Sequence, residues 1–424
     1  MKTLVLVAGL GLLGALAGPA HATVRRVPLD FATITAALAA SSAGDTVLVA
    51  AGTYSAATNG ETFPLQLTTN RIQLFGAGMD ACMLDANGSA SVVRHDAALG
   101  GRVSGFRIMG GSSSLGGGVR IDNGNAEIDH NRIDHNGASV GGAGVFAGNF
   151  AAPWIHHNLI LDNFATSSAD VHGLRFHQSG GGVFEHNLVA HSDGNGLLTV
   201  DFAAPIVRDN IFYQNGIPVP LRGRGICWLS ETSALINHNL FYQNQLAALL
   251  WLGGGGDFSG GMANAYSATD TVYGNVDADP KFVNAAAGDY HLLLGSGAID
   301  AGDPSLPHDA DGTVADIGPF AYTHLASVPV GPSASIALSL SPNPLRSAGD
   351  IRYALPARAV VRVQIMDLSG RVRRVLDEGA REAGEHAVRW DGRDDAGRQL
   401  TTGVYYAQLR AGTAVQSRAV VVIR

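Results

Sequence analysis

Five short segments of the chain share one pattern, and this repeat constrains the fold more than any other feature. Each segment places an apolar residue three positions before an asparagine and a second apolar residue two positions after it. The asparagines are Asn131, Asn158, Asn187, Asn210 and Asn239, and successive residue numbers differ by 27, 29, 23 and 29. A period of about 20–50 residues is typical of a solenoid. The repeat therefore predicts a stack of β coils in which each coil adds its asparagine to one column.

The residues around each asparagine assign the strands of a coil. The apolar positions are expected to point inward: Ile128, Ile155, Phe184, Val207 and Ile236 before the asparagine, and Ile133, Ile160, Val189, Phe212 and Phe241 after it. The intervening positions are largely polar, as alternation along a half-buried strand requires. A third strand, opened by a glycine, is predicted 13 or 14 residues upstream of each asparagine, after Gly118, Gly144, Gly173, Gly196 and Gly225. Asparagine suits the bends because it tolerates unusual backbone angles and bonds neighbouring backbone groups.

The N-terminus has the features of a secretory signal. Residues 1–22 contain one charge, an apolar run and an Ala20-His21-Ala22 cleavage site. This order of segments is typical of a signal peptide, which is removed near Ala22. No later apolar run reaches about 18 residues, so no transmembrane segment is expected in the mature chain. Two cysteines, Cys82 and Cys227, are too few for a disulfide framework and are expected to stay unpaired.

Charge is divided unevenly along the chain. Of 28 basic and 36 acidic residues, 14 basic and 9 acidic residues lie from residue 336 onward, so this part carries +5 and the first 335 residues carry −13. An acidic body argues against nucleic acid as the partner, because phosphate backbones are bound by basic surfaces.

Several motifs resemble a known family. Residues 31–38 are predicted to form a short helix that covers the open end of the stack, and residues 43–54 form a strand that ends in a Gly-Thr-Tyr turn. These segments, the asparagine repeats and the motifs within residues 279–322, named here the closing segment, resemble secreted bacterial pectin-lyase-like proteins. The resemblance covers roughly residues 23–322 and implies a right-handed parallel β-helix (solenoid) with an N-terminal cap.

A second domain follows the solenoid. Residues 323–335 are rich in Pro, Gly and Ser and are expected to be a linker. Short alternating strands in residues 336–424 predict an Ig-like β-sandwich, which makes the whole chain all-β. Its motifs, among them Ser341-Pro-Asn-Pro344 and Thr402–Tyr406, resemble the Ig-like domain of flagellar hook-capping proteins and the sorting domain of the type IX secretion system. A sorting role implies that the type IX machinery is a partner and that the protein is exported to the outer-membrane surface or the medium. A stalk or adhesion module is the alternative.

The resemblance implies that any catalysis occurs on an outer sheet face and acts on acidic polysaccharide. On the glycine-opened strand, Arg120 and Arg175 are expected about 10 Å apart, two rungs along the stack. Arginine binds a uronate carboxylate with two hydrogen bonds, and His172 or His177 can act as a general base. The alternative is a solvated face with no catalytic role. Because Lys281 is the only lysine of the mature chain, lyase families that use a lysine base fit poorly.

Two further groups have two interpretations each. Tyr213, Tyr242 and Phe146 are predicted to point outward, where they either stack on sugar rings or pack on the surface. The histidine column of His130, His157, His186 and His238, with Asp209 in the fourth coil, either binds a divalent metal or forms hydrogen-bonded stacks.

A group of three aspartates suggests calcium as a cofactor. Asp309, Asp311 and Asp316 alternate around Gly312 as carboxylates do in calcium loops, or they form turns. The sequence as a whole favours a secreted or cell-surface protein that binds polysaccharide or has a structural or adhesive role, and the alternative is a polysaccharide lyase or related carbohydrate-active enzyme.

Overall fold

A computed structural model describes residues 22–167, 171–216, 223–229, 233–251, 256–258, 271–322, 337–343, 345–355, 358–367, 371–411 and 414–423. The chain divides into two compact units, Met1–His324 and Leu325–Arg424. The predicted signal peptide, apart from Ala22, and the predicted linker lie outside the described residues. Among the residues that the structure describes, no helix has the length and apolar character needed to cross a membrane.

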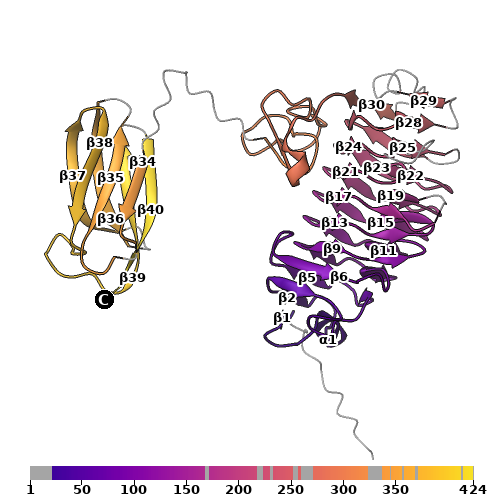
Figure 1. Cartoon of the computed structure of the whole chain (residues 1–424), viewed down its shortest axis with the longest axis horizontal. Helices are drawn as coiled ribbons and strands as arrows, with labels where there is room; N and C mark the ends of the chain where they lie inside the picture. The colour runs from indigo at the N-terminus through magenta and orange to yellow at the C-terminus, as the bar shows by residue number, and fades with distance from the viewer. Residues whose placement is uncertain are drawn as a thin grey trace, which may run out of the picture. The chain divides into compact units, whose positions relative to one another are not determined.

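The first unit is a parallel β-helix built from three long sheets (Figure 1). Sheet A contains β1 (Val24–Val27), β2 (Thr46–Val49), β5 (Gln73–Gly76), β8 (Arg102–Ser104), β12 (Glu127–Asp129), β16 (Trp154–His156), β20 (Val183–Glu185), β23 (Ile206–Arg208), β26 (Leu235–Asn237) and β30 (Val272–Tyr273). Sheet B contains β3 (Gly52–Tyr54), β6 (Cys82–Asp85), β9 (Arg107–Met109), β13 (Arg132–Asp134), β17 (Leu159–Leu161), β21 (Leu188–Ala190), β24 (Ile211–Tyr213), β27 (Leu240–Tyr242) and β31 (Val276–Asp277). Sheet C contains β4 (Leu65–Leu67), β7 (Val93–Asp96), β11 (Val119–Asp122), β15 (Gly141–Gly148), β19 (Val171–Phe176), β22 (Leu197–Thr199), β25 (Arg224–Trp228), β28 (Ala247–Trp251) and β29 (Gly256–Phe258). Each coil contributes one strand to sheets C, A and B in turn, as the sequence repeat predicts.

Smaller elements complete the solenoid. Helix α1 (Ile34–Ala39) begins after Thr33, whose side chain accepts a hydrogen bond from the backbone of Ala36, and it buries Ile34 and Leu38 against the first coils. A helix thus lies close to the position that the sequence predicts, residues 31–38. A short sheet of β10 (Ser112–Ser113), β14 (Gly137–Ala138) and β18 (Phe164–Ala165) lies between sheets B and C along the chain, and β32 (Phe282–Asn284), η1 (Ala285–Ala287) and β33 (Asp289–Leu292) belong to the closing segment.

The asparagine column forms as predicted and extends one coil further, to Asn275. All of its members are at most 3% exposed. The Oδ1 atom of Asn187, for example, accepts from the backbone N–H of Asn158 at 2.9 Å and from its Nδ2 at 3.0 Å. Its own Nδ2 donates to two backbone carbonyls and to Asn210. The ladder thus satisfies backbone groups that the bend leaves without a strand partner.

The residue before each asparagine adopts the left-handed conformation that the bend requires. The φ angles are 51° at His130, 53° at His157, 49° at His186, 55° at Asp209 and 50° at His238. This conformation turns the chain from sheet A to sheet B within two residues, while the inward columns flanking the bend are at most 3% exposed.

The outward positions of sheet B differ from the predicted alternation of apolar and polar residues. Instead of polar residues, several of its strands present apolar side chains outward, and these are at most 4% exposed: Leu159, Leu161, Leu188, Ala190, Ile211 and Leu240. Tyr290, Leu292 and Ile317 of the closing segment pack against them. Figure 1 shows the closing segment beside the strands of sheet B. This second core fastens the closing segment to the side of the solenoid, and it thereby places the end of that segment beside the neighbouring sheet A.

The second unit consists of two antiparallel sheets. One contains β34 (Ala337–Ser341), β35 (Gly349–Leu355) and β38 (Gly384–Trp390), and the other contains β36 (Ala359–Met366), β37 (Val372–Arg381), β39 (Gly403–Ala411) and β40 (Ala414–Val422). Its own core includes Trp390, which is completely buried.

Candidate functional site

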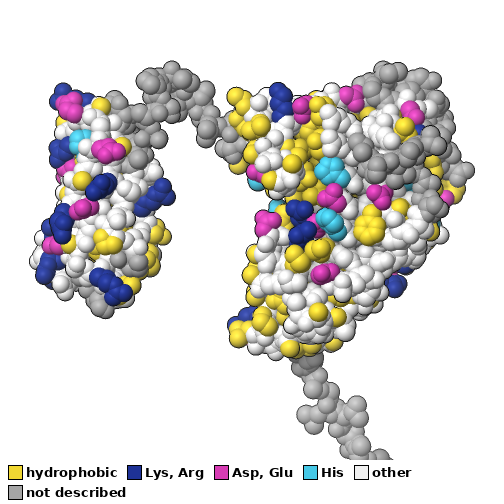
Figure 2. Space-filling view, viewed as in Figure 1, with side chains coloured by type: hydrophobic (Ala, Val, Ile, Leu, Met, Phe, Trp, Pro, Cys, Tyr) yellow, Lys and Arg dark blue, Asp and Glu magenta, His cyan; other side chains and the backbone are white. Residues whose placement is uncertain are grey.

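The outer face of sheet A carries a continuous column of polar side chains. The strand register aligns the last residue of each strand: Ser104, Asp129, His156, Glu185, Arg208, Asn237 and Tyr273. This polar column runs directly beside the histidine column at the bends. Because parallel strands lie about 4.8 Å apart, neighbours in the column are within reach of one another. Figure 2 shows histidine, acidic and basic side chains gathered on this face, beside the closing segment.

Asp129 is held as a buried carboxylate. Its side chain is completely buried, and Arg102 donates to both of its oxygens at 2.6 and 2.5 Å. His130 and Ser104 also donate to Oδ2, at 2.6 and 3.0 Å. Burial by itself would raise the pKa of Asp129, but the hydrogen bonds from Arg102 and His130 outweigh burial and hold this pKa well below its usual range.

The rings of the histidine column are stacked. The His157 ring lies 5.2 Å from the His130 ring and 5.1 Å from the His186 ring. Nδ1 of His130 contacts a carboxylate oxygen of Asp129, and Nδ1 of His186 contacts the backbone oxygen of Asp316 at 3.1 Å. Because these oxygens only accept, Nδ1 carries the hydrogen in both rings. Burial, and then the neighbouring imidazoles, lower the pKa of His157 to about 3.

This geometry favours the hydrogen-bonded interpretation of the column over a shared metal. A metal bound to two imidazoles at about 2.1 Å requires nitrogens at most about 4.2 Å apart. Stacked rings with centroids 5.1–5.2 Å apart do not bring equivalent nitrogens that close.

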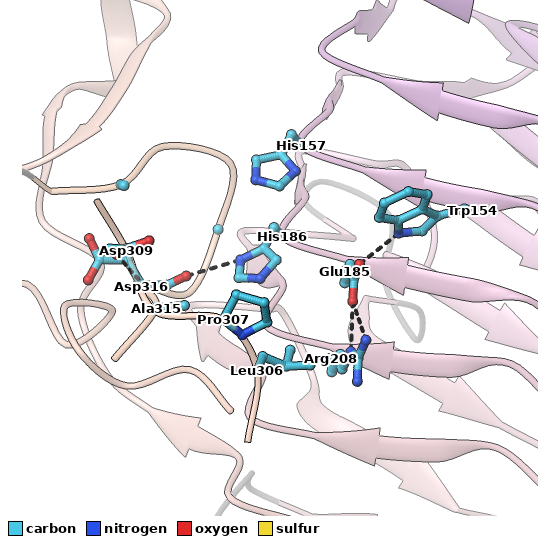
Figure 3. Close-up of a pocket in the computed structure, with 12 residues that line it drawn as sticks. Trp154, His157, Glu185, His186, Arg208, Leu306, Pro307, Asp309, Ala315 and Asp316 are labelled. Atoms are coloured by element: carbon cyan, nitrogen blue, oxygen red, sulfur yellow. Dashed lines mark hydrogen bonds and ion pairs between the residues drawn. The ribbon is translucent and has the colours of Figure 1, made fainter. Parts of the chain in front are cut away.

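A groove lies between sheet A and the closing segment (Figure 3). Its volume is about 330 Å³. The solenoid wall consists of Trp154, His157, Glu185, His186 and Arg208, and the opposite wall includes Leu306, Pro307, Asp309, Ala315 and Asp316.

Three side chains of the solenoid wall form a linked unit. Trp154 donates from Nε1 to Glu185 at 2.6 Å, and Arg208 donates to the other oxygen of Glu185 at 2.7 Å. Although one face of the Trp154 ring packs on His156, with centroids 4.0 Å apart, the side chain remains 45% exposed. The groove therefore combines an open aromatic surface with fixed hydrogen-bonding groups.

The predicted catalytic residues on sheet C are mostly covered. As predicted, Arg120 and Arg175 align across one intervening strand, which carries Phe146. However, Arg175 is 8% and His172 2% exposed, and Nδ1 of His172 lies 3.3 Å from the backbone nitrogen of Asn195. Since buried groups do not meet a substrate on the surface, the expectation of an open site around them is corrected.

The two more exposed members of this set are engaged in ion pairs. Arg120 bonds Asp122 at 2.6 Å, and His177 contacts Asp201 at 2.6 Å. Burial and the charge of Arg175 lower the pKa of His177, against the opposing effect of Asp201.

The predicted sugar-stacking aromatics have different environments. Phe146 is only 2% exposed, because it packs beneath Arg120 and His177, so its ring is not open to a sugar. Tyr213 and Tyr242 are stacked with centroids 6.2 Å apart, and Phe282 of the closing segment packs edge-on against Tyr213. This contact matches the surface-packing interpretation of the tyrosines.

The aspartates of the predicted calcium loop bind the backbone of the loop itself. Asp309 accepts from the backbone N–H of Asp316, and Asp311 accepts from the backbone and hydroxyl of Thr313. Asp316 accepts from the backbone N–H groups of Asp300 and Tyr322. These contacts are those of turn-forming aspartates.

One group of three potential metal ligands is found in the described part of the chain. Ligand atoms of Glu127, Asp129 and His156 lie within 4.8 Å of one another. Arg102, however, already neutralises both carboxylates, at 3.3 Å from Glu127 and 2.5 Å from Asp129. A metal ion there would have to displace the guanidinium, so we interpret the group as an ion-pair network.

The sequence contained a signal for this face that the prediction did not use. The residue preceding each member of the histidine column is itself polar in every repeat, from Asp129 to Asn237. These positions were interpreted only as the polar half of the strand alternation. Trp154 could not be recognised from the repeat. The aligned residues in the neighbouring strands are Glu127 and Val183, so no aromatic residue recurs at this position.

Comparisons with known proteins match both units. A family model described as "Protein of unknown function (DUF1565)" matches residues 23–248, and a model of the FlgD Ig-like domain matches residues 345–414. No curated protein matches the sequence.

Solved structures give remote similarities. Pectate lyase Pel9A is 14% identical with a TM-score of 0.44, and the match covers 72% of this chain and 97% of that one. Two further matches are from Porphyromonas gingivalis. Dimeric latent PorU has 19% identity and a TM-score of 0.18, with 22% of this chain and 10% of that one covered. PorZ, a surface component of the type IX secretion system, has 25% identity and a TM-score of 0.16, with 27% and 14% covered. The matches thus span only 10% and 14% of the PorU and PorZ chains.

Proposed function

Because the chain belongs to the DUF1565 family, whose function is unknown, its role has to be inferred from its own residues, and we propose that it binds a saccharide in the groove between sheet A and the closing segment. The observation that carries the proposal is the half-exposed Trp154 ring, fixed by its hydrogen bond to Glu185 at the edge of the groove. An aromatic ring with one open face packs on the apolar face of a sugar ring.

The groups around Trp154 match the remaining needs of a sugar. Arg208, whose side chain is 22% exposed, offers donors at a fixed position, because Glu185 holds it at 2.7 Å. Sugar hydroxyls accept as well as donate, so they can pair with its guanidinium. The volume of about 330 Å³ is at the lower end of the usual range for small-molecule sites, which suits one or two sugar units of a longer chain.

Binding without turnover is the form of the proposal that the site supports best. The Glu185 carboxylate is already paired with Arg208. His157, with a pKa of about 3, is a weak base at neutral pH. A carbohydrate-active enzyme acting on acidic glycans is the alternative, and an assay for released product separates the two.

The binding test compares two exposed aromatic residues. Purified mature protein is titrated by calorimetry with oligogalacturonate, alginate and neutral glucan oligosaccharides, chosen after a glycan array. Trp154→Ala should weaken binding at least tenfold, about 1.4 kcal/mol. Phe164→Ala is the matched control, because Phe164 is 40% exposed but lies on β18, outside the groove. Equal affinity of wild type and Trp154→Ala for a bound oligosaccharide would contradict the proposed site.

Export and attachment form the second part of the proposal. A cleaved signal peptide and a C-terminal sorting domain would place the solenoid outside the cell, where polysaccharide is available. The match of residues 345–414 to the FlgD Ig-like domain supports the Ig-like assignment. The motifs named above support the sorting role, which the deletion described in the Discussion tests.

A further inference from the structure

A buried cluster lies around Asp209, in the fourth coil of the histidine column, and its carboxylates are not hydrogen-bonded to a basic side chain. Asp209 occupies the position that histidine holds in the other repeats, and its side chain is completely buried beneath the closing segment. Its Oδ1 accepts from the backbone N–H of Asp303 at 2.8 Å, and its backbone oxygen accepts from Gly318, also at 2.8 Å. The closing segment is therefore anchored to the solenoid through this residue.

Two oxygen atoms in this cluster have no hydrogen-bond donor. They are Oδ2 of Asp209 and Oδ1 of Asn237, whose residues are 0% and 1% exposed. Nε2 of His186 is 3.7 Å from Asp209 Oδ2, beyond hydrogen-bond range, and it carries no hydrogen in the neutral ring because Nδ1 donates to Asp316. Buried acceptors without a donor are rare in folded proteins, so each requires a partner.

Asp303 brings a second carboxylate to the same place. Its Oδ2 accepts from Nδ2 of Asn237 at 2.9 Å, and its Oδ1 accepts from the backbone and hydroxyl of Ser305. Asp303 thus contacts both residues that have an unsatisfied oxygen, through its N–H on one side and its carboxylate on the other.

The basic side chains nearest to these two acids are not hydrogen-bonded to them. Arg208, adjacent to Asp209 in sequence, directs its guanidinium to Glu185 at 2.7 Å. Nδ1 of His238 is 4.0 Å from Asp303. Burial raises the pKa of Asp209 to about 7, and the charge of Asp303 adds to this effect.

We infer that Asp209, Asn237 and Asp303 form a binding site for a hard divalent cation, with calcium preferred, that fastens the closing segment to the solenoid. Carboxylate and amide oxygens are calcium ligands, and calcium accepts irregular geometry more readily than magnesium does. Zinc and copper favour thiolate or imidazole ligands, whereas the cluster has no thiolate and its two atoms without a donor are oxygens. The site differs from the predicted loop of Asp309, Asp311 and Asp316, in which no buried side-chain oxygen lacks a hydrogen-bond donor. The inference does not depend on saccharide binding.

The test measures thermal unfolding and direct binding of the whole mature protein. Unfolding is recorded after treatment with EDTA and after addition of Ca²⁺, Mg²⁺ or Zn²⁺. Calcium at about 100 times its dissociation constant should raise the Tm of the solenoid unit by about 5 °C. Tb³⁺, which replaces calcium, should show luminescence sensitised by Tyr273, since its hydroxyl lies 3.3 Å from Asn237, and Ca²⁺ should quench it by competition.

Variants separate this site from the nearby loop. Asp209→Asn keeps the side-chain shape, and asparagine tolerates the local φ of 55°. It should abolish the calcium shift and the Tb³⁺ signal, and Asp303→Asn should weaken both at least tenfold. Asp311→Asn, in the same closing segment, should leave both unchanged. If Asp209→Asn fails to fold, Asn237→Ala provides the same comparison.

Three results would overturn the inference. The first is the absence of any calcium shift in the wild type together with a higher Tm of Asp209→Asn in EDTA, which would mean that the site holds a proton. The second is stabilisation by Zn²⁺ alone, which would exclude an oxygen-ligated hard cation. The third is loss of the calcium shift in Asp311→Asn but not in Asp209→Asn, which would place the ion in the loop of Asp309, Asp311 and Asp316.

Discussion

The histidine column should make the solenoid sensitive to acid, and His157 is the residue on which this prediction can be tested. Its ring lies between those of His130 and His186, at 5.2 and 5.1 Å. Burial and the neighbouring imidazoles lower its pKa to about 3. The perturbation is His157→Asn, because asparagine removes the titrating group and accepts the local φ of 53°.

The sign follows from proton linkage. Unfolded histidine titrates near pH 6.5, whereas folded His157 stays neutral down to about pH 3. The unfolded chain therefore binds more protons between these values. The contribution of His157 to stability is fully present above about pH 6.5 and is lost as the pH falls towards 3. Between pH 7 and pH 5, the loss amounts to at most about 2 kcal/mol from this one residue.

The assay is urea unfolding of the full mature chain at pH 7 and pH 5. Wild type should lose up to about 2 kcal/mol more than His157→Asn on acidification. His135→Asn is the matched control, since His135 also lies at a bend, with a φ of 55°, but its side chain is 54% exposed and it is outside the histidine column. It should retain the wild-type pH dependence. An identical loss in wild type and His157→Asn would refute the reasoning.

Four further predictions concern stability, export and activity. Asn187→Ala should destabilise the solenoid by about 3–5 kcal/mol in chemical unfolding, because it leaves several buried ladder groups without partners. Arg102→Leu should cost about 3–5 kcal/mol, since it leaves the buried Asp129 carboxylate without its guanidinium; Arg26→Leu should cost less, because Arg26 and its partner Asp30 have side chains that are 56% and 32% exposed. Deletion of residues 336–424 should trap the protein in the periplasm when fractions are compared by immunoblot, and normal export would contradict a sorting role. Incubation with pectate, alginate and glycosaminoglycans should yield no unsaturated uronate by ultraviolet absorbance; turnover would instead support the enzyme alternative, and turnover that is unchanged in Arg175→Ala would exclude the sheet C residues as its site.

The regular part of the fold could be predicted because it is local. Each coil repeats the same inward residues, from Ile128 to Ile236, and the same bend asparagine, and stacking is the one arrangement that buries all of them. The α1 cap was predictable for a similar reason, since an open solenoid end exposes strand edges.

The groove was not predictable in the same way, because its two walls lie about 130 residues apart in sequence. Nδ1 of His186, for instance, meets the backbone of Asp316. The polar column is visible in the sequence as alternate polar residues, but the pairs that it forms, such as Glu185 with Arg208, depend on the strand register.

The sequence by itself determined the stack, the asparagine ladder and the histidine column, because periodic side chains specify which neighbours each coil contacts. Only the tertiary structure decided which outer face is covered. The apolar outward positions of sheet B, such as Leu188 and Leu240, attract the closing segment, and this packing places Asp303 and Asp316 against sheet A. The same packing encloses the groove and buries Asp209. No repeat contains that information, since it arises from contact between a periodic surface and a segment outside the period.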